Sequence, residues 1–319
     1  MRIRSSFLTI LLALASVNLS GLPASSAETV RILTARPGWQ AISVWYAKDL
    51  GLFAKRGVEV NHISLDSSPA VMEAFVSGQG DLAIANVGTA VNAYFRGVPL
   101  RIVAGSPASD YPIMAVAPAI KGLADLKGKK IAIWSVPSDA TLALDVVVKK
   151  QGLNAGTDFT YVRVPAQNVC DTIKRGQADA GIVFEPYASA CLLNDAHRVA
   201  PAGTVSFDPP KLVSSSVVIV NADFLAKHRD AVKATVQALD DAVRWAAKNK
   251  SEAVKSLTKY SGQPENAISL SYDSANFDIS IDRDYHDILL KRYEQANLIH
   301  KVPSAEDMKT LYQTDLVKP

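Results

Sequence analysis

Hydrophobic and polar positions alternate with two different periods along the chain. A strand-like apolar run at 29–35 is followed by a helical pattern that ends at Gly51, and β-branched residues mark a second strand at 58–65. A further helical pattern ends at Gly78, and the apolar run DLAIA occupies 81–85. This order predicts a strand–helix–strand–helix–strand unit.

The same unit starts again about a hundred residues later. A strand-like run at 130–135 precedes a helical pattern that ends at Gly152. A strand at 159–164 and a helix that ends at Gly176 follow, and DAGIV at 179–183 is the third strand. Strands that alternate with helices indicate crossover connections and parallel sheets. Two copies are too few to bury the core of a stacked solenoid, so each copy is predicted to form its own α/β lobe.

The rest of the chain divides between these lobes. Residues 99–118 leave the first lobe, and the apolar run at 214–221 reads as a strand that returns to it. The remaining C-terminal segment has mostly helical periodicity and is expected to pack on lobe one. We therefore expect lobe one to comprise 28–115 and 216–319, and lobe two to comprise 116–215.

The N-terminus has the features of an export signal. Arg2 and Arg4 precede a short apolar run at 7–17, and small residues lead to a cleavage point after Ala27. A membrane span would need about 20 apolar residues, which is more than this run provides. We expect residues 1–27 to be a signal peptide that is removed, and the mature protein to be exported without inserting into the membrane.

The charge balance disfavours a nucleic-acid partner. The sequence contains 34 Lys and Arg residues and 31 Asp and Glu residues, a formal net charge of +3. Loss of Arg2 and Arg4 with the signal reduces this to +1. Binding to a phosphate backbone depends on clustered Lys and Arg, and such clustering is weak here.

The sequence contains two cysteines, Cys170 and Cys191. In an oxidising compartment they could form a disulfide. The distance between their Cα atoms decides whether this is possible, and spacing along the chain does not give that distance. A disulfide and a pair of free buried thiols both stay open.

The repeat places a binding site between the lobes. In open α/β sheets, ligands bind at the carboxyl ends of the strands, and two lobes that face each other share one such cleft. Helix N-termini at this cleft would favour an anionic ligand. The residues expected to line the cleft are Arg36, Gly38, Trp39, Gln40, Ser67, Ser68, Asn86, Gly88 and Thr89 in lobe one, and Ser138, Asp139, Thr141, Glu185 and Tyr187 in lobe two.

Several of these residues have two interpretations. A guanidinium at Arg36 could bind a sulfonate or carboxylate with two hydrogen bonds, or it could be a surface arginine at the end of a strand. Trp39 and Tyr187 could stack on the organic part of a ligand, or they could pack within the lobes. Trp45 and Tyr46 are expected to be better core candidates than Trp39.

The acidic residues near the cleft also have alternatives. Glu185 would repel a pure anion unless the ligand also carries an amine, and it could instead pair with Arg36 as a latch between the lobes. Ser138 could cap its helix as well as contact ligand. Asp81 and Asp179 precede the third strand of each copy, and we expect them to stabilise the turn rather than bind ligand.

Five segments carry a resemblance to a known family. They are AKDLGLFAKRGVEV at 47–60, GQGDLAIANVGTA at 78–90, GVPLRIVAG at 97–105, GLADLKGKKIAI at 122–133 and GQADAGIVFEPYA at 176–188. In this order they resemble the periplasmic solute-binding proteins of ABC importers, in particular the nitrate/sulfonate/taurine-type family.

The resemblance implies the two-lobed type II periplasmic-binding-protein fold, whose lobes close over a small, anionic organic solute. It also implies a periplasmic location and permease subunits of the inner membrane as partners. We expect a monomer without cofactor or metal.

Catalysis and signalling are the alternatives. Ser256 and Lys259 fit a Ser-x-x-Lys spacing but lack partner motifs. The five histidines lack metal-ligand spacing, and the sequence has no nucleophile elbow, Walker loop or complete dinucleotide fingerprint. We therefore expect a binding protein rather than an enzyme. An enzyme on the same fold, of the class that makes pyrimidine precursors, stays open, as does a ligand sensor for a membrane receptor.

Overall fold

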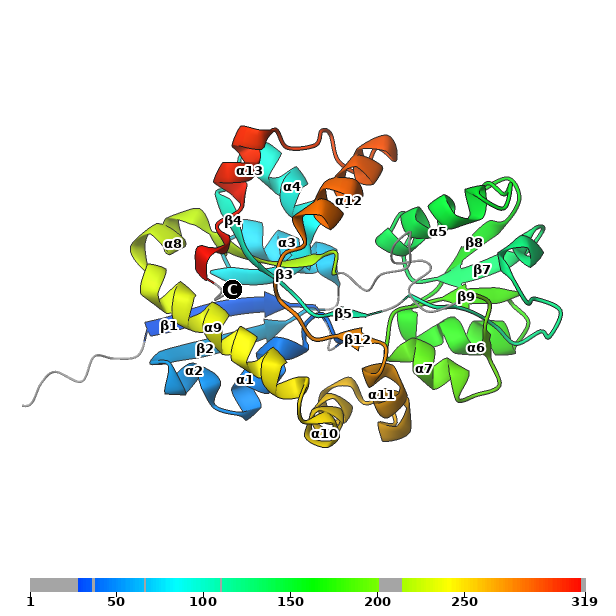
Figure 1. The fold of residues 1–319 in the computed structure, drawn as a ribbon, viewed down its shortest axis with the longest axis horizontal. Helices are drawn as coiled ribbons and strands as arrows, with labels where there is room; N and C mark the ends of the chain where they lie inside the picture. The colour runs from blue at the N-terminus through cyan, green and yellow to red at the C-terminus, as the bar shows by residue number, and fades with distance from the viewer. Residues whose placement is uncertain (1–27, 36–37, 66, 110, 201–213, 317–319) are drawn as a thin grey trace, which may run out of the picture.

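The structure, a computed structural model, describes residues 28–35, 38–65, 67–109, 111–200 and 214–316. It has two lobes, each built around a five-stranded sheet with helices on both faces (Figure 1). The predicted signal peptide lies outside the described residues. Within the described part of the chain, the helices are too short or too polar to cross a membrane.

The lobe-one sheet has the strand order β2-β1-β3-β11-β4. Its strands are β1 (Glu28–Thr34), β2 (Val58–Ser64), β3 (Leu82–Asn86), β4 (Leu100–Gly105) and β11 (Ser216–Asn221). β1 is parallel to β2 and β3, as the crossover pattern predicts. β11 lies antiparallel between β3 and β4, which confirms that this late strand returns to lobe one.

The lobe-two sheet has the order β10-β6-β9-β7-β8. Its strands are β6 (Ile113–Ala115), β7 (Lys130–Ile133), β8 (Thr160–Arg163), β9 (Ala180–Ile182) and β10 (His197–Arg198). β7 is parallel to β8 and β9, and β6 is antiparallel to β9 and β10. Both sheets therefore contain three mutually parallel strands, and further strands join them through antiparallel pairing.

The first crossing between the lobes comes earlier than expected. The sequence assigned residues up to 115 to lobe one, but β6 pairs with β9 and so belongs to the second sheet. The apolar segment around Met114 is compatible with either sheet, and its partner strand lies some 65 residues further along the chain. A short sheet of β5 (Ala108–Ser109) and β12 (Ala275–Asn276) lies beside this crossing.

Glycines end the helices of both copies. The first copy contains α1 (Ile42–Asp49), α2 (Leu52–Lys55), α3 (Ser68–Val76) and α4 (Val87–Phe95). The second copy contains α5 (Asp139–Lys149), α6 (Val169–Lys174) and α7 (Tyr187–Leu192). Short 3₁₀ turns occur at Leu123–Leu126, Ala166–Asn168 and, near the C-terminus, Thr314–Leu316. Gly78 after α3 and Gly176 after α6 have φ of +77° and +69°. This left-handed conformation favours glycine, so the motif itself fixes where each helix stops.

The aspartate of the repeated Gly-Gln-x-Asp motif joins two strands. The Asp81 carboxylate accepts the backbone N–H of Arg31 at 2.8 Å, and the Asp179 carboxylate accepts that of Lys130 at 2.8 Å. The backbone N–H of each aspartate donates to the carbonyl oxygen of the same partner residue. The predicted structural role is confirmed, but each side chain anchors the first strand of its lobe instead of capping its own turn.

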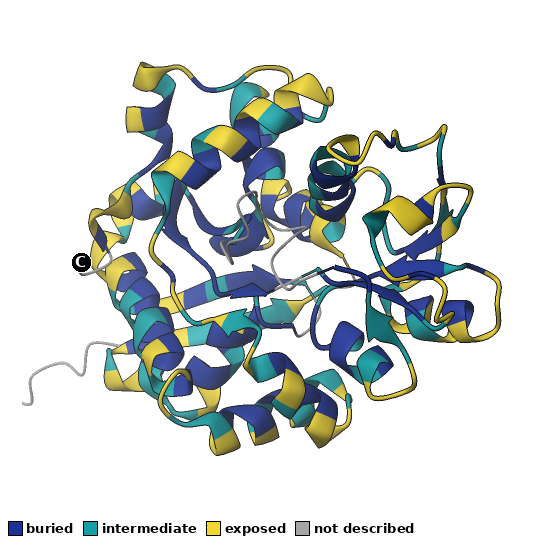
Figure 2. Cartoon of the chain, turned by 45° about the vertical axis from the view of Figure 1, so that its right-hand side comes forward, coloured by how far each residue is buried: buried dark blue, intermediate teal, exposed yellow. Residues whose placement is uncertain are grey.

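The C-terminal helices cover both faces of the lobe-one sheet. They are α8 (Ala222–Lys227), α9 (Arg229–Ala246), α10 (Lys250–Ser261), α11 (Glu265–Tyr272), α12 (Arg283–Gln295) and α13 (Ala305–Leu311). α9 packs against α1 on one face through Val232, Val236 and Leu239. α12 and α13 pack with α3 and α4 on the other face. Figure 2 shows the central strands and the inner helix faces mostly dark blue and the outer helix faces yellow. The predicted packing on lobe one is confirmed, and α11 additionally contacts α7 of lobe two.

Cys170 and Cys191 form a disulfide, which resolves the alternative left open by the sequence. Their Cα atoms lie 5.2 Å apart, within the range that a disulfide needs. The bond joins α6 to α7, and Cys191 is fully buried. It therefore holds together the two helices that flank the cleft side of lobe two.

We expect the disulfide to stabilise lobe two measurably. The linked cysteines are 21 residues apart, and a loop of this size stabilises the folded state by about 3 kcal/mol. Urea denaturation of the double variant Cys170→Ala/Cys191→Ala should show a loss of about 2–4 kcal/mol relative to the oxidised protein. An unfolding midpoint that is the same with and without reductant would contradict this.

Candidate functional site

The loops that follow the parallel strands of the two lobes meet at the interlobe boundary. Asn86 at the end of β3 contacts Asp139, which follows β7. Gly38, which follows β1, faces the loop after β9, because a β-carbon placed on Gly38 would lie 3.8 Å from the Glu185 carbonyl oxygen. The structure thus brings together loops from both copies, as the repeat predicts.

Asp139 crosses from lobe two into lobe one. It is the first residue of α5, and its Oδ2 atom accepts a hydrogen bond from Asn86 Nδ2 at 2.7 Å. The hydroxyls of Tyr293 on α12 and Ser215 on the returning crossing also donate to this carboxylate. Asn86 Nδ2 lies 3.0 Å from the Tyr293 hydroxyl, so the four side chains form one connected network. This network, Asp139–Asn86–Ser215–Tyr293, is called the interlobe clasp below.

The described partners of the clasp carboxylate are uncharged. They are the side chains of Asn86, Ser215 and Tyr293, which donate to Asp139. Burial raises the pKa of Asp139, and the three hydrogen bonds oppose this shift. Burial also raises the pKa of Tyr293 well above its ordinary value, so its hydroxyl keeps the proton that it donates. Opening the lobes would break these bonds.

Most helix N-termini at the cleft are already capped. Asn86 Oδ1 accepts the Gly88 N–H at 2.8 Å at the start of α4. Ser67 and Ser138 accept backbone N–H groups at the starts of α3 and α5. Glu185 Oε2 accepts the Ser189 N–H at 2.9 Å in the first turn of α7. Among the described residues, α1 and α6 start without a side-chain hydrogen bond to their first turns. Uncapped N–H groups at a helix start are of the kind that favour an anion.

Glu185 is a fully buried residue of lobe two. Its Oε1 atom lies 3.6 Å from Arg198 Nη2, and Ser274 Oγ of the segment between α11 and β12 donates to Oε1 at 3.4 Å. This carboxylate therefore joins lobe two to the C-terminal segment of lobe one. Arg36 lies outside the described residues, so its contact with an anion or with Glu185 stays a prediction.

Trp39 is a core residue. It is fully buried, and its Nε1 atom donates to Ser271 Oγ at 3.0 Å. Its ring packs edge-on against Tyr272 and Phe277, which the C-terminal segment supplies. Trp45 is only half-buried, so the expectation that it would be the better core candidate is wrong. The residues that bury Trp39 lie more than 230 positions away from it in the sequence.

The remaining predicted residues of lobe one differ in role. Gln40 Nε2 donates to Ser109 Oγ at 3.1 Å and so ties the start of α1 to the crossing. A β-carbon on Gly88 would lie 2.6 Å from the Tyr293 ring, so glycine there allows the clasp tyrosine to pack against α4. Thr89 is half-buried, and Ser68 is exposed.

Two predicted residues of lobe two have contacts of their own. Thr141 forms a capping box with Ser138, which gives the serine the structural role that the sequence suggested. Tyr187 packs edge-on against Phe184 at 5.3 Å between ring centroids. It also lines a groove of about 140 Å³ between α6, α7 and Gln263.

Three aromatic residues of the cleft edge were not predicted. Tyr111 precedes β6, Trp134 follows β7 and Phe184 follows β9. The rings of Tyr111 and Trp134 stack with an angle of 22° and 5.8 Å between centroids, and Trp134 packs edge-on to Phe184 at 5.2 Å. Phe184 directly follows the strand predicted at 179–183, and Trp134 lies near the end of the one predicted at 130–135, so their positions at strand ends are the sequence signal that could have found them.

The Ser-x-x-Lys spacing belongs to a surface network. Ser256 Oγ donates to Asp49 at 2.8 Å, and Lys259 Nζ lies 3.0 Å from the Tyr260 hydroxyl and 3.4 Å from Asp49. The hydrogen bonds to Tyr260 and Asp49 raise the pKa of Lys259. The contacts with Asp49 link α10 to α1.

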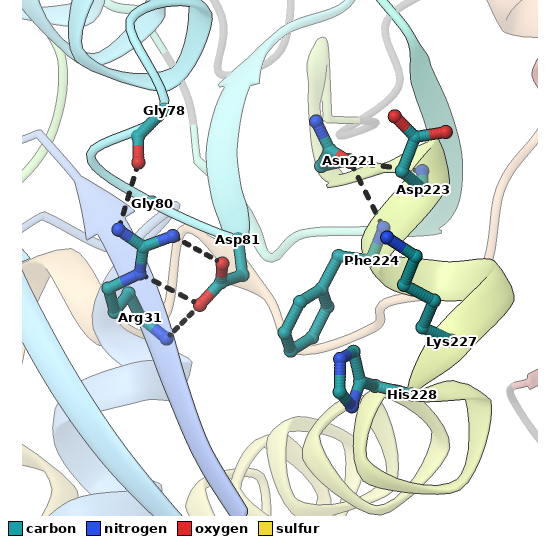
Figure 3. Close-up of a pocket in the computed structure, with 9 residues that line it drawn as sticks. All are labelled: Arg31, Gly78, Gly80, Asp81, Asn221, Asp223, Phe224, Lys227 and His228. Carbon is teal, nitrogen blue, oxygen red and sulfur yellow. Dashed lines mark hydrogen bonds and ion pairs between the residues drawn. The ribbon is translucent and has the colours of Figure 1, made fainter.

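A separate groove of about 270 Å³ lies at the far edge of lobe one (Figure 3). Its walls include Arg31 and Asp81 on one side and Asn221 and Lys227 on the other. The Arg31 guanidinium is bound to Asp81 and to the Gly78 carbonyl oxygen. This edge carries the structural Asp81 anchor, at the opposite end of β3 from the cleft.

We expect Asp139→Ala to open the unliganded protein. Hydrogen bonds to a charged group contribute about 1.5–3 kcal/mol each, so losing even one shifts the closed-to-open ratio about tenfold or more. Small-angle X-ray scattering should show a larger radius of gyration for this variant. Asp171→Ala, at a side chain that is 66% exposed on α6, is the matched control and should leave the scattering unchanged. An unaltered curve for Asp139→Ala would mean that the clasp does not set the closed state.

Comparison with known proteins agrees with the predicted resemblance. Residues 39–253 match the family model described as NMT1/THI5 like. The taurine-binding periplasmic protein of Escherichia coli K12 is 27% identical over 229 residues, which is 67% of this chain and 68% of that protein. The putative aliphatic sulfonates-binding protein of the same strain is 30% identical over 190 residues, and the match spans 56% of each chain.

Solved structures share the fold. The periplasmic aliphatic sulphonate binding protein of E. coli has a TM-score of 0.74 at 20% identity, with 92% of this chain and 94% of that chain covered. The periplasmic nitrate-binding protein of Synechocystis PCC 6803 has a TM-score of 0.70 at 16% identity, with coverage of 91% and 87%. These similarities confirm the predicted two-lobed fold, and the family match extends over 215 residues. The chain therefore belongs to the NMT1/THI5-like family.

Proposed function

We propose that the protein is the periplasmic substrate-binding component of an ABC importer. The observation that carries this is the meeting of the two sets of strand-end loops, held together by the interlobe clasp. A solute that contacts both lobes favours the closed form over the open one. The names of the taurine- and sulfonate-binding relatives support a small anionic organic solute.

The start of α1 is the best candidate for the anion-binding part of this site. Its first turn lacks a side-chain cap, and Gly38 lies in the turn that leads into it, facing the loop after β9. Arg36, two positions earlier, would add a guanidinium that can bind a sulfonate or carboxylate with two hydrogen bonds. In this proposal the α1 start and Arg36 bind the charged group of the solute.

Catalysis is less well supported than binding. Ser256 and Lys259 of α10 both bind Asp49 of α1. Among the described residues, no group of three or more His, Cys, Asp or Glu side chains could hold a metal. A receptor role is the second candidate, because a membrane sensor would also recognise the closed lobes. Capture of an importer permease by the liganded protein would support import, and capture of a sensor kinase or chemoreceptor would support signalling.

Removal of the Arg36 side chain tests the anion site. Calorimetry with a panel of taurine, alkanesulfonates, arylsulfonates, nitrate and carboxylates should identify a bound anion. Arg36→Ala should weaken its binding by about tenfold or more, because the proposed charge partner of the anion is lost. The melting temperature without ligand should change little.

Arg175→Ala is the matched control for this test. Its side chain is 70% exposed on lobe two, and binding should be unaffected. Equal affinity of wild type and Arg36→Ala for the same anion would remove Arg36 from the site. A panel without any binding anion would contradict the proposed function itself.

A further inference from the structure

The two walls of the cleft differ in chemical character. The lobe-one loops contribute small and polar residues, namely Gly38, Asn86 and Thr89. The lobe-two edge contributes the rings of Tyr111, Trp134 and Phe184, from three neighbouring strands in the order β6, β9 and β7. One wall is therefore suited to a charged group and the other to a flat apolar group.

The three rings form a continuous surface, called the aromatic row below. Tyr111 and Trp134 stack nearly parallel, with centroids 5.8 Å apart, and Phe184 meets Trp134 edge-on at 5.2 Å. The row closes the end of the lobe-two sheet, because Tyr111 packs on one of its hydrophobic clusters, Phe184 on the other and Trp134 on both.

The burial of the aromatic row differs from that of the core rings. Trp39, Tyr46 and Phe159 are almost completely buried, whereas all three rings of the row are half-buried. A ring that only sealed the core would gain from full burial, since buried apolar area stabilises the fold at about 25 cal/mol per Å². Part of the surface of these rings is therefore exposed to solvent.

The anion site and the aromatic row are neighbours. A β-carbon on Gly38 would lie 3.9 Å from Cε2 of Phe184, so the loop before α1 approaches the row at van der Waals distance. A solute with its charged group at the start of α1 would then have its adjacent atoms next to the rings. Aromatic pairs in offset-stacked or edge-to-face contact are stabilised beyond the apolar area that they bury.

We propose, on the basis of the function proposed above, that the solute is a small aromatic anion. Its anionic group binds at the start of α1, and its single ring packs on the aromatic row of Tyr111, Trp134 and Phe184. Trp134 contacts both other rings, so it contributes most to the selection of an aromatic solute over an aliphatic one.

Three sulfonates separate ring recognition from charge recognition. Calorimetry with benzenesulfonate, cyclohexanesulfonate and methanesulfonate keeps the charged group constant. Benzenesulfonate should bind about three- to tenfold more tightly than cyclohexanesulfonate, since aromatic contacts add to the apolar area that both rings bury. Methanesulfonate should bind most weakly. Benzoate and acetate repeat the comparison for a carboxylate.

The variant Trp134→Leu tests the residue itself. It should lower the affinity for benzenesulfonate about three- to tenfold and leave that for methanesulfonate unchanged. Trp245→Leu is the matched control, because Trp245 is also half-buried but packs on Tyr46 within lobe one. This control should not change the ratio of the two affinities, even if both variants melt at a lower temperature.

The possible outcomes distinguish the two proposals. Binding of taurine or methanesulfonate at least as tight as that of benzenesulfonate would overturn the aromatic assignment and leave the solute-binding function standing. The same conclusion would follow from an unchanged affinity ratio in a folded Trp134→Leu protein. Failure of all sulfonates and carboxylates to bind would contradict both the solute class and the proposed function.

Discussion

One half-buried carboxylate joins the two lobes through three hydrogen bonds. Asp139 belongs to lobe two, but its hydrogen-bond donors lie on lobe one and on the returning crossing. Separating the lobes breaks all three bonds at once, and water must replace them because a carboxylate left without donors is unfavourable. The donors are uncharged, and water can replace them more readily than it could replace a cation. Such a contact suits two lobes that must both close and open.

The clasp also organises the residues around it. Asn86 caps α4 with its oxygen and binds Asp139 with its nitrogen, so one amide connects the helix start to the other lobe. Gly88 leaves room for Tyr293, whose hydroxyl donates to the same carboxylate. The cleft helices α3, α4 and α5 satisfy their own first turns with side-chain caps, whereas α1 and α6 start without one among the described residues.

The parts of the fold that local physical chemistry dictates could be read directly. The alternation of strands and helices and the glycine helix stops follow from short stretches of sequence. The assignment of β11 to lobe one followed because an apolar strand needs a sheet to join. The solute-binding class followed from the order of five motifs. These features depend on neighbours within a few residues or on a repeated pattern.

Contacts between distant segments were decided by the tertiary structure. Trp39 became a core residue because α11 and the segment after it cover it, and β6 joined lobe two because its partner β9 lies there. Asp139 was expected in the cleft from its sequence position, but its role as a clasp depends on Tyr293, 154 residues away. The disulfide and the aromatic row likewise needed Cα and ring positions that no local pattern contains. Sequence by itself determined the two lobes and the edge where they meet, because periodicity and turn chemistry are local. Which side chains face each other there was fixed only in three dimensions, because burial and hydrogen bonding depend on residues far apart in the chain.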